Sequence, residues 1–131
     1  MSAESVLQAA LLAALRGDAA LAAGLNGVFE GAAVKASVPF AELGELLAVD
    51  WGTKTAAGRE VRVAVTVRGA GDTGAVVSGL AGAVGAAIEV VPRDLAGWRL
   101  ASVVFLRTRL LRGGPGAWAA VVEYRVRMMA V

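Results

Sequence analysis

The chain has 131 residues, 57 % of them hydrophobic, a net charge of +2, and neither cysteine nor histidine. This length supports one hydrophobic core, so we expect a single domain over residues 1–131. The absence of cysteine excludes disulfides and thiolate chemistry, and the absence of histidine removes the commonest general base and metal ligand. We therefore expect no catalytic residues, metal site or cofactor, and a carboxylate-based enzyme is the least favoured class.

The charged residues divide the chain into two unequal parts. Residues 1–58 carry three basic and six acidic side chains, whereas residues 59–131 carry ten arginines and five acidic side chains. Two uncharged segments, 6–15 and 74–88, are shorter than the roughly 20 residues that cross a bilayer. We expect both to be buried helices of a cytoplasmic protein without a membrane partner.

The N-terminal part predicts two helices and a short strand. Apolar residues at helical spacing predict a helix over residues 3–16, with Ser2 as the cap of its first turn. Asp18 can cap a second segment over residues 19–23, and residues 28–30 suit a short edge strand.

The clearest strand of the chain follows a long polar connection. Over residues 59–68, four valines alternate with polar or small side chains, which is the pattern of a strand with one buried face. An extended segment over residues 40–49 precedes it. The two segments predict a hairpin around the connection 50–58, and connections of that length are often functional or mobile.

A helix and a hairpin complete the predicted elements. Residues 74–90 have an apolar helical stripe, with Asp72 or Thr73 as the cap. Residues 98–111 and 117–129 predict two long antiparallel strands joined by a glycine-rich turn. The fold class is thus α/β (α+β), a mostly antiparallel or mixed sheet of 4–5 strands with two main helices packed on one face.

Strict alternation along the first strand of this hairpin assigns its side chains to two faces. Val103, Phe105, Arg107 and Arg109 would share one face of the sheet. In the last strand, Trp118, Ala120, Val122, Tyr124, Val126 and Met128 would share the buried face, opposite Arg125 and Arg127.

Three groups of residues are candidate interaction sites. The loop offers one anionic, one cationic and two hydroxyl side chains beside a tryptophan, which suits partner binding: Asp50, Trp51, Gly52, Thr53, Lys54, Thr55. A basic group on adjacent strands suits a lumen lining, an inter-subunit face or contact with phosphates, and a solvated sheet face is the plainer alternative: Arg107, Arg109, Arg125, Arg127. Three helix-interior glycines suit close packing against another backbone: Gly79, Gly82, Gly85.

A glycine pattern also raises the question of a cofactor. Gly69, Gly71 and Gly74 have the spacing of a dinucleotide-binding loop between a strand and a helix. No second βαβ unit follows them, so we expect no cofactor.

The sequence resembles the phage-type tail-completion proteins that include the tail terminator of gene transfer agents. The resemblance rests on four segments: the helix over residues 4–16 with Asp18-Ala19-Ala20-Leu21, Val38-Pro39-Phe40, Asp50-Trp51-Gly52-Thr53-Lys54-Thr55 before the central strand, and Leu95-Ala96-Gly97-Trp98-Arg99-Leu100. It implies a structural protein without enzymatic activity. Six copies would form a ring on the end of the tail tube, stop its polymerisation and join it to the head-completion (stopper) ring.

The resemblance implies assembly in the cytoplasm, a final position at the head–tail junction, and possible non-specific proximity to DNA. Two other functions stay open at this point: a head–tail connector or other completion ring, and a small nucleic-acid-binding module that uses the arginines.

Overall fold

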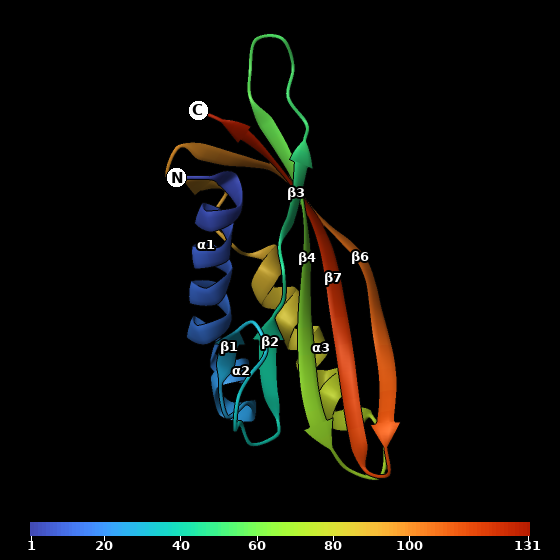
Figure 1. The fold of residues 1–131 in the computed structure, drawn as a ribbon. Helices are drawn as coiled ribbons and strands as arrows, with labels where there is room; N and C mark the ends of the chain where they lie inside the picture. The colour runs from blue at the N-terminus through green and yellow to red at the C-terminus, as the bar shows by residue number, and fades with distance from the viewer.

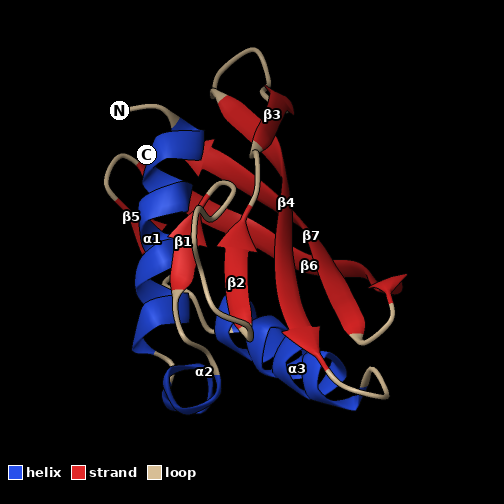
Figure 2. Cartoon of the chain, turned by 60° about the horizontal axis from the view of Figure 1, so that its bottom comes forward, coloured by secondary structure: helices blue, strands red, loops and turns tan.

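The computed structural model describes residues 1–131 as a curled mixed sheet with three helices on one face (Figures 1 and 2). The helices are α1 (Ala3–Gly17), α2 (Ala19–Gly24) and α3 (Ala75–Glu89). The strands are β1 (Val28–Glu30), β2 (Phe40–Leu43), β3 (Leu47–Asp50), β4 (Gly58–Ala70), β5 (Asp94–Leu95), β6 (Trp98–Gly114) and β7 (Ala117–Ala130).

The sheet has seven strands in the order β1-β2-β4-β7-β6-β5, with β3 paired to β4 alongside β2. All pairings are antiparallel except that of β1 with β2. The mixed α+β class and the two main helices are confirmed, but the expected number of 4–5 strands is wrong. The two additional strands are β3, which was expected to be continuous with β2, and β5; they are four and two residues long, too short to carry a clear alternation of polar and apolar residues.

Side chains of one parity on the two central strands form the core with the helices. Val61 and its three alternate valines on β4 are buried, as are Tyr124, Val126 and Met128 on β7. They join the leucines of α1 and the apolar face of α3 in one cluster of 24 residues, and no polar or charged residue is buried. The predicted buried face of β7 is confirmed, except that Trp118 is only half-buried.

Two of the three predicted N-terminal helix caps are confirmed. The hydroxyl of Ser2 accepts a hydrogen bond from the Ser5 amide at 3.2 Å, and the carboxylate of Asp18 accepts one from the Leu21 amide at 3.0 Å. At α3 neither Asp72 nor Thr73 occupies the cap position, which is Gly74, but the Thr73 hydroxyl accepts a hydrogen bond from the Ala75 amide, the first of the helix, at 3.3 Å. None of the three helices has the length and apolarity needed to cross a membrane.

The extended segment predicted over residues 40–49 is two strands. β2 pairs with the second half of β4 and β3 with its first half, and both run antiparallel to it. Residues 44–46 bridge them, and the amide of Gly44 donates to the carbonyl of Ala64 at 2.9 Å. The predicted hairpin is therefore formed by β3 and β4 alone.

Strict alternation fails along β6. The pairing with β7 shifts register at three points, between Leu100 and Ser102, Phe105 and Arg107, and Arg112 and Gly114. Each shift inserts one residue, which is a β-bulge and reverses the faces of the side chains that follow it. Phe105 pairs with buried Tyr124 on the helix side, whereas Arg107 pairs with Glu123 on the opposite side. The expectation that Val103 and Phe105 share a face with Arg107 and Arg109 is therefore wrong.

Candidate interaction surfaces

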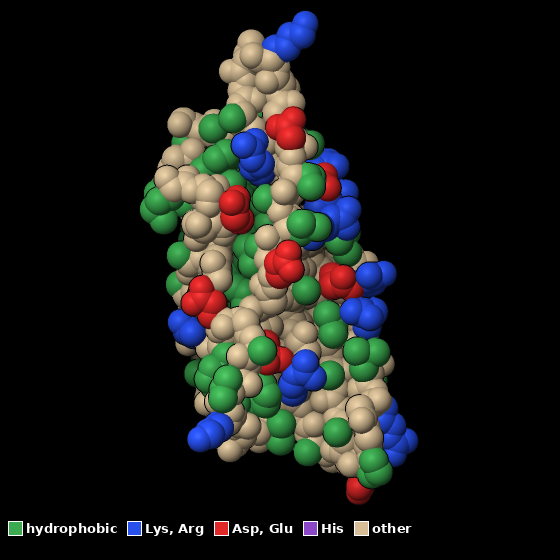
Figure 3. Space-filling view, viewed as in Figure 1, with side chains coloured by type: hydrophobic (Ala, Val, Ile, Leu, Met, Phe, Trp, Pro, Cys, Tyr) green, Lys and Arg blue, Asp and Glu red, His purple; other side chains and the backbone are tan.

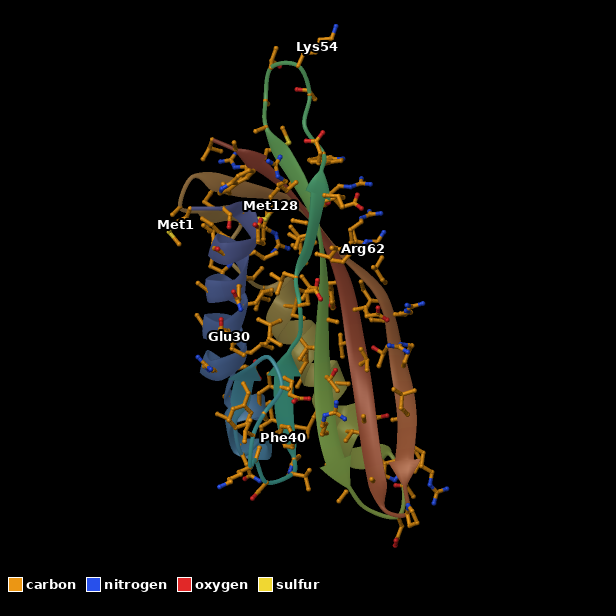
Figure 4. All side chains as sticks on the ribbon, viewed as in Figure 1. Met1, Glu30, Phe40, Lys54, Arg62 and Met128 are labelled. Carbon is orange, nitrogen blue, oxygen red and sulfur yellow. The ribbon has the colours of Figure 1, made fainter.

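The β3–β4 hairpin projects beyond the body of the molecule, with Lys54 at its tip (Figures 1 and 4). Its loop, residues 51–57, is closed by two backbone bonds, from Trp51 to Gly58 at 3.0 Å and from Thr53 to Ala56 at 2.8 Å. The Thr53 hydroxyl accepts from the Ala56 amide at 3.2 Å. Lys54 makes no ion pair and is exposed, so the tip presents a free cation to solvent.

The base of the loop is fixed to the body through Trp51. The guanidinium of Arg127 lies over the Trp51 ring, 5.3 Å from its centre. A Cβ on Gly58 would lie 2.6 Å from the Trp51 carbonyl oxygen, so only glycine allows this close approach. The Trp51 side chain is half-buried, and the group that lies over its ring belongs to β7 and not to its own hairpin.

The other loop residues divide between local structure and solvent. The Asp50 carboxylate accepts from the Gly52 amide at 3.2 Å and lies 3.5 Å from the Arg59 guanidinium. Asp50, Gly52 and Thr53 therefore shape the turn, whereas Lys54 and Thr55 face outward. That the loop binds a partner stays a prediction.

The face of the sheet opposite the helices, here called the outer face, carries all four predicted arginines. Arg107 pairs in register with Glu123, and Arg125 pairs with Arg62 of β4. Basic side chains gather along the side formed by β6 and β7, as Figure 3 shows. Arg62, which points away from the helices in Figure 4, is not among the predicted arginines, although it stands on the polar side of the central strand. We call Arg62, Arg107, Arg109, Arg125 and Arg127 the arginine face.

Two glutamates neutralise part of the arginine face. Glu60 lies 3.0 Å from Arg127 and 3.7 Å from Arg62, while Glu123 bridges Arg107 and, at 3.4 Å, Arg109. Hydrogen bonds from Arg127 and Arg107, with the surrounding positive charge, hold the pKa of Glu60 and of Glu123 below the ordinary range.

The fifth arginine is less well paired. The Nε of Arg125 is buried without a hydrogen-bond partner. Five arginines thus share two carboxylates, which leaves the face positively charged.

We expect this network to make folding sensitive to acid. Because the folded pKa values of Glu60 and Glu123 are lowered, their contribution is present above the ordinary value of 4.5 and is lost as the pH falls below it. The free energy of unfolding, measured by urea titration from pH 3 to 7, should therefore decrease below about pH 4.5. The double variant Glu60→Gln, Glu123→Gln should have a flatter profile, and an unchanged profile would contradict this assignment.

The three predicted packing glycines lie on different sides of α3. A Cβ on Gly85 would be 3.1 Å from the Tyr124 hydroxyl, whereas Gly79 and Gly82 have no atom within 4 Å of that position. The Tyr124 hydroxyl donates a hydrogen bond to Glu89 at 2.7 Å. Burial raises the pKa of Tyr124, and the hydrogen bond and charge of Glu89 raise it further. Only Gly85 therefore packs closely within the chain.

Alanine at the two open positions should stabilise the isolated chain. Each exposed helical glycine costs about 1 kcal/mol relative to alanine, so Gly79→Ala with Gly82→Ala should raise the melting temperature. Gly85→Ala is the matched control and should gain less, because the Tyr124 hydroxyl must move. If the double variant also lowers the yield of assembled particles, the two glycines lie at a boundary with another subunit. A lower melting temperature would show that α3 tolerates no methyl group there.

The comparisons agree with this architecture over nearly the whole chain. The family described as "Tail completion protein gp17" matches residues 9–129. No curated protein matches the sequence. A chain in the structure titled "Virion of native gene transfer agent (GTA) particle" superposes with a TM-score of 0.87 and 26 % sequence identity, covering 98 % of both chains. The chain therefore belongs to the tail completion protein gp17 family and has a structural role in a phage-type tail.

Proposed function

We propose that this protein is a tail terminator. Six copies form a ring on the end of the tail tube, stop its polymerisation and join the tail to the head-completion ring. The proposal is carried by the similarity along 98 % of the chain to a chain of a gene transfer agent virion. The protein assembles in the cytoplasm and ends at the head–tail junction, where the closed ring is a cyclic homo-oligomer.

The two polar surfaces have separate roles in this proposal. The β3–β4 hairpin reaches beyond the body of the subunit, so it contacts the next ring or the tube. The arginine face lines the lumen or a boundary between subunits, since the helices leave this side of the sheet uncovered. Positive charge on that side keeps DNA that passes through the ring near the wall without reading its sequence.

Removal of the gene tests the proposal. Cells without this protein should produce tails longer than normal that are not joined to heads, and a copy of the gene in trans should restore the normal length. Electron microscopy of the restored particles should locate a ring of this protein at the junction. Tails of normal length that lack heads would instead assign the protein to a head–tail connector ring. Normal, joined tails would contradict both assignments.

The positive charge of the arginine face predicts a weak affinity for nucleic acid that can be measured. Five arginines and two glutamates give this face a local charge of about +3, so we expect weak, non-selective DNA retention. The log–log dependence of affinity on salt should be no steeper than about −3, since each neutralised phosphate contributes about −0.9. Filter binding of duplex DNA between 50 and 200 mM salt measures this salt dependence, and the double variant Arg107→Ala, Arg109→Ala is the control. Tight, sequence-selective binding would favour a nucleic-acid-binding module.

A further inference from the structure

Two strand edges at opposite sides of the sheet have no partner. β6 pairs with β7 along its length, but on its other side β5 covers only Trp98 and Arg99. β3 pairs with β4 on one side and with no strand on the other. Unpaired edges are templates for pairing with another chain, and a free stretch from Ser102 to Gly114 is longer than a monomer ordinarily leaves open.

The side chains along these edges are apolar and exposed. Leu47 and Val49 on β3 are 56 % and 51 % exposed, and Leu111 on β6 is 42 % exposed. Leu47 pairs in register with Arg62, and Leu111 pairs with Ala119, which places both on the outer face. The two edges therefore present apolar groups on the same side of the sheet.

The charges of the two edges are complementary. Glu45, just before β3, is exposed and makes no ion pair or hydrogen bond within the chain. Arg107 and Arg109 share the single carboxylate of Glu123. One edge thus has an unpaired carboxylate, and the other has more guanidinium groups than partners.

The strand directions also allow the two edges to pair. β3, β4, β7 and β6 are neighbours joined by three antiparallel pairings, so β3 and β6 run in opposite directions. Rotation about an axis along the strands preserves strand direction, so it brings the β6 of one copy antiparallel to the β3 of another. Leu47 pairs with Arg62, Arg62 with Arg125, and Arg125 with Val104, so this rotation brings Leu47 of one copy level with Val104 of the next, on the same face of the sheet.

We propose that neighbouring copies join through antiparallel pairing of β3 of one copy with the 102–107 stretch of β6 of the next. Because residue 106 is a bulge, Glu45 then lies opposite Arg107 and diagonal to Arg109 of the next copy, and the sheet continues from subunit to subunit around the ring. This inference rests on the proposed ring and identifies the surface that closes it.

The absence of cysteine makes a direct test possible. Six double variants, each with one cysteine at Leu47 or Val49 and one at Ser102, Val104 or Arg107, are incorporated into particles and oxidised. Within one copy the two edges are three strand spacings apart, roughly 14 Å, beyond the Cα separation of about 7 Å that a disulfide allows. Any disulfide between these positions therefore joins two copies.

We expect at least one pair to give a ladder of covalent species at multiples of 13.2 kDa on non-reducing gels. The control combines Val104→Cys with Val90→Cys, which is 79 % exposed at the end of α3, outside both edges, and it should give no ladder. Glu45→Arg should reduce the yield of the Leu47–Val104 cysteine pair roughly fivefold, the upper value for an exposed ion pair. Glu45→Arg combined with Arg107→Glu and Arg109→Glu should restore it.

The test separates this inference from the function on which it rests. If microscopy of the same particles locates the ring at the junction but no cysteine pair forms a ladder, the edge pairing is wrong and the terminator function stands. A disulfide to a different protein would also overturn it, because the β6 edge would then meet the tube or the head. Overlong tails in single-cysteine controls would show that an exposed substitution alone disturbs assembly. In that case the charge-reversal variants are made without cysteines, and the yield of rings from each variant tests the edge pairing.

Discussion

Replacing Trp51 and Lys54 with alanine should abolish tail-length control while the subunit stays folded. Lys54 is exposed at the tip of the projecting hairpin, and Trp51 is the largest apolar side chain at its base. Truncation of a tryptophan that anchors an interface typically costs 2 kcal/mol or more. Electron microscopy should therefore find tails longer than normal, or tails without heads.

The stability of this variant must be measured with its tail length. Loss of the stacking of Arg127 on Trp51 should cost about 0.5–1 kcal/mol, a decrease of a few degrees in melting temperature, whereas Lys54→Ala alone should cost nothing measurable. Lys35→Ala is the matched control, because Lys35 is the only other lysine and is also exposed. Normal tails from the double variant would show that the loop is not the contact.

Leu11→Ala should destabilise the subunit more than any surface change. Leu11 is completely buried in the core cluster between the helices and the sheet. Removal of a buried leucine typically costs about 2–5 kcal/mol, a large part of the 5–15 kcal/mol that holds a domain folded. The midpoint of urea unfolding should therefore fall strongly.

The same substitution at Leu111 provides the control. Leu111 is 42 % exposed on β6, and its truncation should change the free energy of unfolding by about 0.5 kcal/mol or less. Equal shifts of the two unfolding midpoints would show that Leu11 is not the core residue that its burial indicates.

The sequence predicts well the parts of the fold that depend on local patterns. The alternating valines of β4 and the leucines of α1 both bury the side that their period indicates. The caps Ser2 and Asp18 are also local, since each bonds an amide three residues away.

The parts that the sequence did not predict depend on pairing between distant residues. The bulge at Leu106 is an additional residue relative to β7, and no alternation within β6 alone reveals it. The stacking of Arg127 on Trp51 joins residues that are far apart in sequence, so it follows from the β4–β7 register. The composition of the loop predicts its exposed tip but not the anchoring of its base.

The separation of charge across the sheet also has a consequence for kinetics. Acidic groups such as Glu45 and Asp50 lie towards the β3 edge, while most arginines of the outer face lie towards β6 and β7. Each free subunit therefore has an electric dipole directed across its strands. Such a field orients two approaching copies before contact and accelerates their encounter, and salt above about 0.1 M screens it within roughly 10 Å.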